Sequence, residues 1–111
     1  MQETAVRFAI CDDDKTYAEK MKALILQTFQ LPQPVECVIY LNQEQILKYY
    51  REDKIDIIFM DIEFGDVIGF QVARRLSMQD SQLAVVYMTN YEHYITEAFV
   101  CRPLGFIRKS P

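Results

Sequence analysis

Glycine is scarce in this sequence, with three residues among 111. Gly65, Gly69 and Gly105 form neither a GxGxxG fingerprint nor a P-loop, the two loops that bring backbone N–H groups to a bound phosphate. The first turn after an apolar strand instead carries three aspartates, at positions 12–14. Their charge would repel a phosphate at the start of the next helix. The sequence therefore argues against a nucleotide or flavin binder.

Histidine and cysteine are also few. His93 is the only histidine and no CxxC pair occurs, so a zinc site has no ligand set. Cys11, Cys37 and Cys101 are odd in number, widely spaced and set in apolar surroundings. This pattern predicts buried free thiols in a reducing cytoplasm, with a reactive thiol or a metal ligand as the alternative.

Positive charge and long apolar runs are lacking too. The formal net charge of −4 argues against nucleic-acid contact by this segment, because duplex binding neutralises phosphates with Lys and Arg. Any DNA contact would have to come from a segment not present here. No apolar run approaches the roughly 20 residues that span a bilayer, and residues 1–4 lack a signal-peptide pattern. We expect a cytoplasmic protein without membrane contact.

Half of the residues are hydrophobic, which predicts a single globular domain over residues 1–111. Short apolar, β-favouring runs predict strands at residues 6–11, 35–40, 55–60, 83–88 and 104–108. Helical periodicity and capping signals predict helices at residues 15–29, 42–52, 70–78 and 91–100. Asp13 or Asp14 can cap the first helix, and a loop carrying Gly65, Asp66 and Gly69 precedes the third.

Strands and helices therefore alternate along the chain, which predicts an α/β fold with a parallel sheet covered by helices on both faces. No helix follows the last predicted strand before Pro111. If such a helix would hide ~400 Å² of apolar surface, its absence costs on the order of 10 kcal/mol as an upper bound. For a chain that ends at Pro111 we expect concentration-dependent dimers or larger species.

The residues at the carboxyl ends of the strands suggest a chemistry, because ligands of open α/β sheets bind there. Asp12, Asp61, Thr89 and Lys109 each follow or end a different predicted strand. Several carboxylates together are unfavourable unless a hard cation such as Mg²⁺ neutralises them. An aspartate beside that ion can accept a phosphoryl group, Lys109 can offset more of its charge, and Thr89 can donate a hydrogen bond to it.

Four stretches of the chain, at residues 9–14, 57–69, 85–89 and 98–109, together resemble the receiver domains of bacterial response regulators. The resemblance is nearest to receivers that precede LytTR-type DNA-binding domains. It implies a flavodoxin-like, doubly wound sheet of five parallel strands in the order 2-1-3-4-5, here without the final helix. It also implies a phosphoacceptor rather than an enzyme, with at most slow self-dephosphorylation. A sensor histidine kinase would be the donor, and an absent output domain would regulate transcription.

The resemblance also implies a role for each matching position. Asp61 would be the phosphoacceptor, and Lys109 would contact the phosphoryl group. The Mg²⁺ ligands would be Asp12, Asp13, Asp61 and the backbone carbonyl of Glu63. The switch residues would be Thr89 and Phe106.

Two positions depart from the family pattern. Gly65 stands where the family usually has proline, four residues after the phosphoacceptor, so we expect a looser loop there. Ser110 follows Lys109 where the family usually has proline, which puts in doubt the cis peptide that the family places at that point.

Other interpretations stay open at this level. Asp12 and Asp14 after an apolar strand also resemble the nucleophile and the acid/base of haloacid-dehalogenase-type phosphatases. That family needs a further acidic pair after a later strand, where this chain has Thr89 and Asn90. The domain is alternatively an interaction module of the same fold that is never phosphorylated. The three aspartates are alternatively only a favourable helix N-terminus, and Phe106 is alternatively ordinary core.

Overall fold

A computed structural model describes residues 5–80, 82–89 and 105–108, with backbone only for Thr89 and for residues 105–108. Its main sheet has five parallel strands: β1 (Val6–Cys11), β2 (Val35–Tyr40), β3 (Ile57–Asp61), β6 (Ala84–Thr89) and β7 (Gly105–Arg108). They lie side by side in the order β2-β1-β3-β6-β7. The predicted strand order 2-1-3-4-5 is therefore confirmed, since β6 and β7 are the fourth and fifth strands of this sheet.

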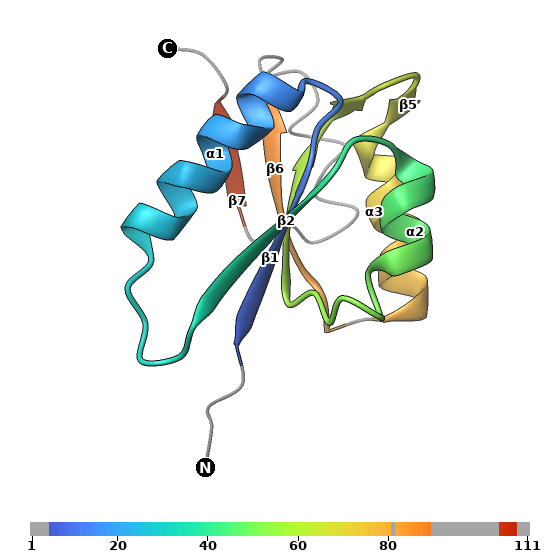
Figure 1. Cartoon of the computed structure of the whole chain (residues 1–111). Helices are drawn as coiled ribbons and strands as arrows, with labels where there is room; N and C mark the ends of the chain where they lie inside the picture. The colour runs from blue at the N-terminus through green and yellow to red at the C-terminus, as the bar shows by residue number, and fades with distance from the viewer. Residues whose placement is uncertain (1–4, 81, 90–104, 109–111) are drawn as a thin grey trace.

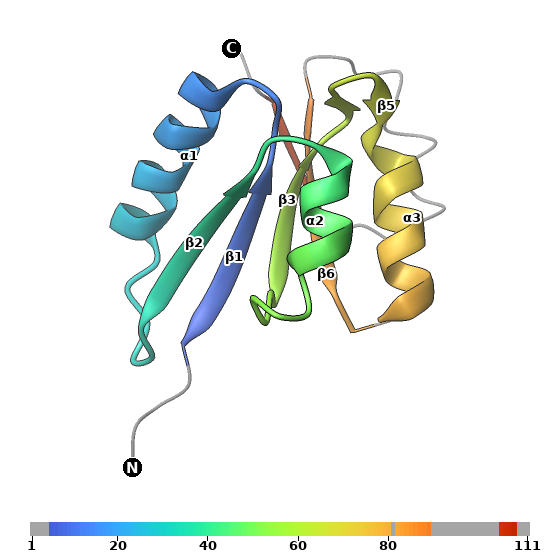
Figure 2. The same ribbon diagram turned by 45° about the vertical axis from the view of Figure 1, so that its right-hand side comes forward.

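Helices cover both faces of the sheet, as the alternation of elements predicted. α1 (Lys15–Thr28) lies on one face, and α2 (Gln43–Tyr49) and α3 (Gly69–Gln79) lie on the other (Figures 1 and 2). The helix predicted at residues 91–100 lies outside the described residues. Within the part of the chain that the structure describes, none of the helices has both the length and the apolar character that crossing a membrane requires.

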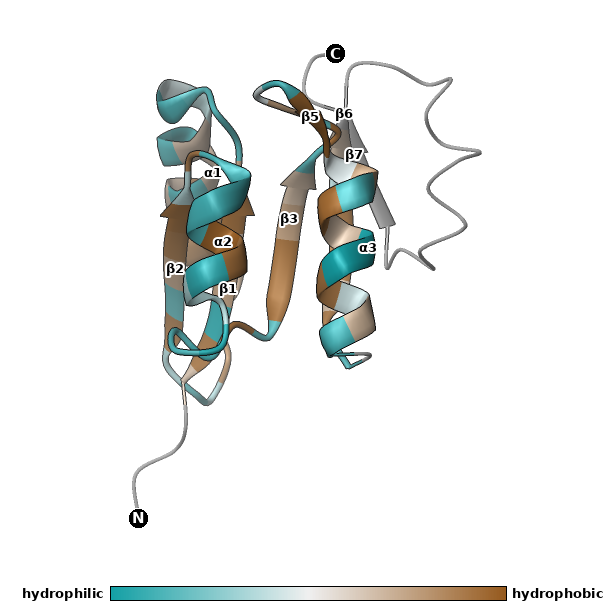
Figure 3. Cartoon of the chain, turned by 90° about the vertical axis from the view of Figure 1, so that its right-hand side faces the viewer, coloured by the Kyte–Doolittle hydropathy of each residue, from teal (hydrophilic) through white to brown (hydrophobic). Residues whose placement is uncertain are grey.

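The central strands are apolar on both sides because each side is buried under helices. In β1, Phe8 and Ile10 join the core cluster beneath α1, whereas Ala9 and Cys11 join the cluster beneath α2 and α3. This alternation follows from the two-residue period of a strand. Figure 3 shows apolar residues along the strands and hydrophilic ones on the outward side of α2.

α1 begins where the sequence placed it. Asp14 is the N-cap, and its Oδ1 accepts a hydrogen bond of 3.0 Å from the backbone N–H of Tyr17. Of the two aspartates that could cap this helix, Asp14 does so. Ala18, Met21 and Ile25 recur at helical spacing and form the buried stripe of α1.

α2 is shorter than predicted, and the next strand starts later. The helix ends at Tyr49, and residues 51–54 form turns in which Lys54 adopts the left-handed conformation, with φ of 54°. The N–H of Ile55 then donates to the carbonyl of Tyr50 at 3.1 Å, so Ile55 belongs to this turn rather than to a strand. Strand β3 consequently begins at Ile57.

A small antiparallel hairpin follows β3, where a loop was predicted. Its strands are β4 (Glu63–Phe64) and β5 (Val67–Ile68), joined by Gly65 and Asp66. Gly65 has φ of +66°, and a glycine with positive φ at the first central position is typical of a type II′ hairpin turn. Gly65 thus permits a two-residue turn at this position. The looser loop expected there stays a prediction.

Candidate functional site

The sheet register brings the ends of four strands to one edge. Cys11 pairs with Met60, so Asp12 and Asp61 are the next residues on two neighbouring strands. Asp61 in turn pairs with Met88, which precedes Thr89. Thr89 pairs with Arg108 of β7. The backbones of the predicted site residues on β1, β3 and β6 therefore meet at one edge.

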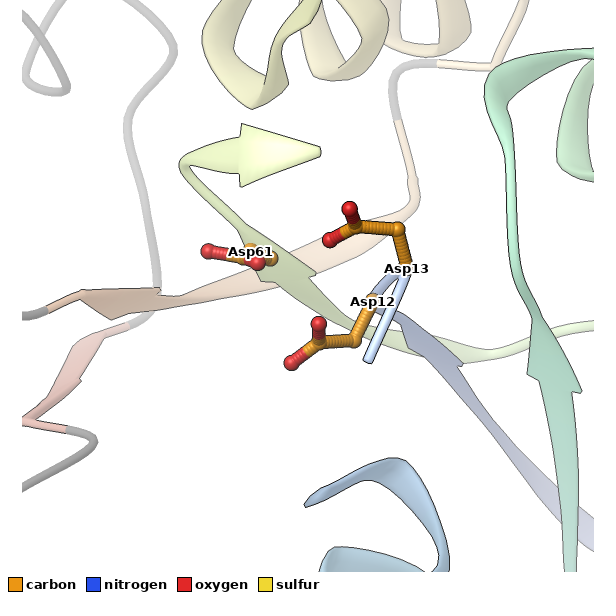
Figure 4. A group of neighbouring side chains, drawn as sticks. All are labelled: Asp12, Asp13 and Asp61. Carbon is orange, nitrogen blue, oxygen red and sulfur yellow. The ribbon is translucent and has the colours of Figure 1, made fainter. Parts of the chain in front are cut away.

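Three carboxylates gather at this edge (Figure 4). Asp12, Asp13 and Asp61 each offer an oxygen atom, and these oxygens all lie within 4.8 Å of one another. Asp12 is 0% exposed and Asp61 is 5% exposed, whereas Asp13 lies at the surface. Like charges at this distance in a partly buried site repel strongly. The cluster is therefore a site that a cation would stabilise.

Backbone N–H groups orient the two buried carboxylates. Oδ1 of Asp12 accepts from the N–H of Asp14 at 2.9 Å, and Oδ1 of Asp61 accepts from the N–H of Glu63 at 3.1 Å. Each bond spans two residues, the spacing of an Asx-turn, so each aspartate is held by the loop that follows its own strand. The carboxylates are thus fixed before any ligand arrives.

Two neighbours of the cluster take no part in it. The side chain of Asp14 caps α1 and is not a member of the group of three carboxylates. Cys11 belongs to the core cluster beneath α2 and α3. Burial there, and secondarily the charge of Asp12, raises the pKa of its thiol well above the usual value. Burial therefore favours the protonated thiol, and Cys11 is not a member of the group of three possible metal ligands.

Gly69 packs against the backbone of Asp61. A Cβ atom at position 69 would lie 2.1 Å from the Asp61 carbonyl oxygen. Two nonbonded atoms cannot approach so closely, so the present backbone accommodates only glycine at this position. The N–H of Gly69 also donates to the carbonyl of Ile62, and the N–H of Ile62 donates to Met88 at 3.1 Å. The hairpin thus returns the chain so that α3 starts directly against the loop that carries Asp61.

The structure places the remaining predicted residues only in part. Glu63 is exposed and opens β4 next to Asp61. Phe106 lies on β7, paired with Tyr87 of β6, and Thr89 ends β6; for both residues only the backbone is described. Lys109 lies outside the described residues. Their roles therefore stay predictions.

Sequence reasoning missed the hairpin and the contact of Gly69. A signal for the hairpin was present, since Gly65-Asp66 is a two-residue turn pair flanked by short β-favouring segments. Nothing local predicts the contact between Gly69 and Asp61, because it depends on how the hairpin folds back in space. The N-cap of α3 is Ile68, whose side chain cannot accept a capping hydrogen bond. An apolar residue at this position indicates that contacts other than a side-chain cap hold the start of α3.

The donor set fits Mg²⁺ by its chemistry. Carboxylate oxygens are hard ligands, and Mg²⁺ usually binds one or two protein carboxylates and keeps several waters. A cation bound by these three carboxylates would reduce the repulsion between them. One of the carboxylates could then act as a nucleophile.

The fold and this acidic edge define a class of protein, and a family comparison agrees with it. A sequence model of the response regulator receiver domain matches residues 8–110. The chain therefore belongs to the response regulator receiver domain family.

Known relatives and structures are consistent with this assignment. The chain is 28% identical over 106 residues to the sensory transduction protein LytT of Bacillus anthracis, covering 94% of this chain and 41% of that protein. It is 32% identical over 102 residues to LytR of Streptococcus mutans, covering 90% and 41%. The chain thus spans about two-fifths of the length of these relatives.

Among solved structures, the response regulator TrrA of Thermotoga maritima, in complex with Mg²⁺-BeF, superposes with a TM-score of 0.81. It shares 22% identity, and the match covers 95% of this chain and 87% of that one. This likeness supports the fold.

Proposed function

We propose that Asp61 is the phosphoacceptor of this receiver domain and that a sensor histidine kinase is its donor. The observation that carries the proposal is the approach of the Asp12, Asp13 and Asp61 oxygens to within 4.8 Å at the carboxyl edge of the sheet. Asp61 ends the central strand β3 and is held there by the N–H of Glu63. Family membership makes this edge the place where such chemistry is expected.

The reaction is a phosphoryl transfer between two side chains. An oxygen of the Asp61 carboxylate attacks the phosphorus, the P–N bond of the donor phosphohistidine breaks, and the leaving imidazole nitrogen takes up a proton. The product is an aspartyl phosphate, whose hydrolysis returns inorganic phosphate and the carboxylate. Each phosphoryl transfer thus modifies one Asp61 carboxylate, and slow self-dephosphorylation restores it. The domain does not turn over a substrate as an enzyme does.

Mg²⁺ completes the proposed site. Asp12, Asp13 and Asp61 would hold it, together with the backbone carbonyl of Glu63. When bound, the ion offsets negative charge on the phosphoryl oxygens. The protein's own contribution is to hold the Asp12 and Asp61 carboxylates in place through backbone hydrogen bonds.

Thr89 and Phe106 are the proposed switch residues, and Lys109 is the proposed cation beside the phosphoryl group. The support is positional. Thr89 pairs with Arg108 of β7 at the edge of the sheet where β3 ends in Asp61. Phe106 lies on β7 as well, two residues before Arg108. A phosphoryl group on Asp61 gives Thr89 a charged hydrogen-bond partner. Thr89→Ala should leave phosphorylation intact and reduce the NMR shift changes that a phosphate analogue causes.

The wider setting is part of the proposal. Relatives more than twice as long as this chain support a longer regulator with a LytTR-type DNA-binding output that controls transcription. Buried free thiols at Cys11 and Cys37 support a cytoplasmic location. Self-association as a dimer is also part of the proposal, and sedimentation at rising protein concentration tests it.

A haloacid-dehalogenase-type phosphatase is the competing function, and one contact disfavours it. Its acid/base would be Asp14, but the Asp14 side chain caps α1 and lies outside the carboxylate cluster.

Phosphorylation with a small phosphodonor, such as phosphoramidate, and Mg²⁺ tests the proposal. We expect a gain in mass of one phosphoryl group that Asp61→Asn abolishes. Asp66→Asn is the matched control, because Asp66 is an exposed acid in the turn of the nearby hairpin and should accept nothing. Equal labelling of the Asp61→Asn variant and the wild type would overturn the assignment.

A further inference from the structure

Strand β2 forms one margin of the main sheet, and among the described residues no strand lies on its outer side (Figure 2). Two hydrogen bonds show which way its backbone groups point. The carbonyl of Pro34 accepts from the N–H of Val6 at 2.8 Å, and the carbonyl of Tyr40 accepts from the N–H of Asp12 at 3.1 Å. The even-numbered residues of β2 therefore turn their backbone groups toward β1, and the odd-numbered residues turn theirs outward.

The outward backbone groups belong to Val35, Cys37 and Ile39. Their three N–H donors and three carbonyl acceptors have no partner among the described residues, because the ladder with β1 uses the residues between them. The next outward N–H, that of Leu41, already donates to Oε1 of Gln45 at 2.7 Å. The open stretch of the edge is thus short and is centred on Cys37.

The sequence of β2 does little to protect this edge. Natural edge strands are usually blunted by lysine, proline or a bulge. β2 contains neither lysine nor proline, and its register with β1 runs without a bulge from Val35 to Tyr40. Its one charged residue, Glu36, is bound to Arg7 of β1 at 2.8 Å. The edge is therefore open to pairing with another strand.

The helix above this edge carries both signs of charge. Glu19, Lys22 and Leu26 lie three and four residues apart, so they share one side of α1. Burial causes most of the rise in the pKa of the Cys37 thiol, and the charges of Lys22 and Glu19 adjust it. Both side chains therefore lie near Cys37, and this side of α1 overlooks the middle of β2. Leu26 on the same side is 43% exposed.

We propose that β2 pairs in antiparallel fashion with β2 of a second copy of the chain, with Cys37 on the two-fold axis. Val35 of each copy then pairs with Ile39 of the other, and every outward N–H and carbonyl finds a partner. The resulting six hydrogen bonds compare with roughly ten in a typical interface. Glu36 faces Val38 of the second copy, so like charges are not placed opposite each other.

The charges on α1 select a second copy over an unrelated extended segment. Across the two-fold axis, the two α1 helices lie on the same face of the joined sheet and run in opposite directions. Because Glu19 and Lys22 both lie near the axis, Glu19 of each copy faces Lys22 of the other. A single extended segment would use only the backbone groups of β2. The proposal names a surface for the self-association proposed above, on which it rests, and it does not depend on phosphorylation of Asp61.

Sedimentation of the unphosphorylated protein over a concentration series tests the proposal, with circular dichroism to verify that each variant is folded. Val35→Pro removes the outward N–H of Val35 and no hydrogen bond to β1, a substitution that edge strands tolerate. The dimer loses two hydrogen bonds, so we expect its dissociation constant to rise at least ~10-fold. Val35→Ala is the matched control, because it keeps the N–H, and it should dimerise as the wild type does.

Charge reversal on α1 gives a second test that leaves the strand unchanged. Glu19→Lys and Lys22→Glu each place like charges opposite each other twice in the dimer, so each should raise the dissociation constant at least ~10-fold. The double substitution exchanges the two charges and should restore dimerisation. Lys20→Glu is the matched control, since it makes the same charge change at an exposed position on another side of α1.

The outcomes distinguish this surface from self-association in general. A dimer that Val35→Pro leaves unchanged, or a double variant as weak as either single one, would overturn the β2 edge as the surface and leave self-association through another surface standing. A protein that stays monomeric at millimolar concentration would overturn both.

Discussion

Asp12, Asp13 and Asp14 are consecutive residues with different surroundings. The first two face the carboxylate cluster with Asp61, and the third caps α1 through its contact with Tyr17. Asp12→Ala or Asp13→Ala should raise the Mg²⁺ dissociation constant at least ~10-fold, or ~1.4 kcal/mol, because a ligand is lost. Asp14→Ala should leave Mg²⁺ affinity nearly unchanged and lower the free energy of unfolding by ~1 kcal/mol, because a cap is lost.

Calorimetric titration with Mg²⁺ and urea unfolding separate the two effects. The assignment fails if Asp14→Ala impairs Mg²⁺ binding more than either of the other substitutions.

Gly69 and Gly65 are glycines for different reasons, and alanine separates them. Gly69→Ala places a methyl group 2.1 Å from the Asp61 carbonyl, so we expect a loss of ~3 kcal/mol or more in the free energy of unfolding. At Gly65 the space is open and only the positive φ resists a side chain, so Gly65→Ala should cost ~1 kcal/mol. Chemical denaturation measures both, and a larger loss at Gly65 would contradict the packing account.

At the scale of elements, the turn after α2 contains a strained residue. Lys54 has φ of 54°, a conformation that suits glycine better than residues with a Cβ. Lys54→Gly should therefore raise the free energy of unfolding by ~0.5–1 kcal/mol. Lys48→Gly, inside α2, is the matched control and should lower it by ~1 kcal/mol. Thermal unfolding of the two variants against the wild type gives the answer, and destabilisation by Lys54→Gly would show that its side chain contributes more than its backbone costs.

The elements that the sequence predicted well are those with strong local signals. Continuous apolar runs located the strands of the main sheet within two residues, and Asp14 and Asn42 cap the helices that their positions suggested. The end of α2 was misplaced because residues 50–52 have no helix-breaking residue, and the helix stops where Lys54 turns the chain. The convergence of Asp12 and Asp61 was predictable since parallel strands share one carboxyl edge. The approach of Gly69 to Asp61 was not, because it depends on tertiary packing.

For the whole molecule, buried protonated groups predict alkaline instability. Burial raises the pKa of the Cys37 thiol from 9.0 to about 11, with Lys22 lowering it and Glu19 raising it to smaller extents. The unfolded chain releases this proton near pH 9, whereas the folded protein holds it to about pH 11. Folding stability from this group is thus complete below pH 9 and is lost as pH rises to about 11.

Burial, and secondarily its hydrogen bond to Asp53, also raises the pKa of Tyr40, which acts in the same direction. Unfolding followed by circular dichroism between pH 8 and about 11 should show declining stability, with a shallower decline in Cys37→Ala. An identical decline in that variant would exclude Cys37 as a source.

The central claim concerns which carboxylate becomes phosphorylated. Asp12 and Asp61 are both buried, their oxygens lie within 4.8 Å, and both belong to the same edge, so only the position of the adduct distinguishes an acceptor from a cation ligand. The direct measurement is trapping of the acyl phosphate by borohydride reduction, followed by peptide mapping by mass spectrometry. The proposed function predicts one modified residue, Asp61, formed only with Mg²⁺ present. Modification of Asp12 instead, or no modification with any phosphodonor, would contradict it.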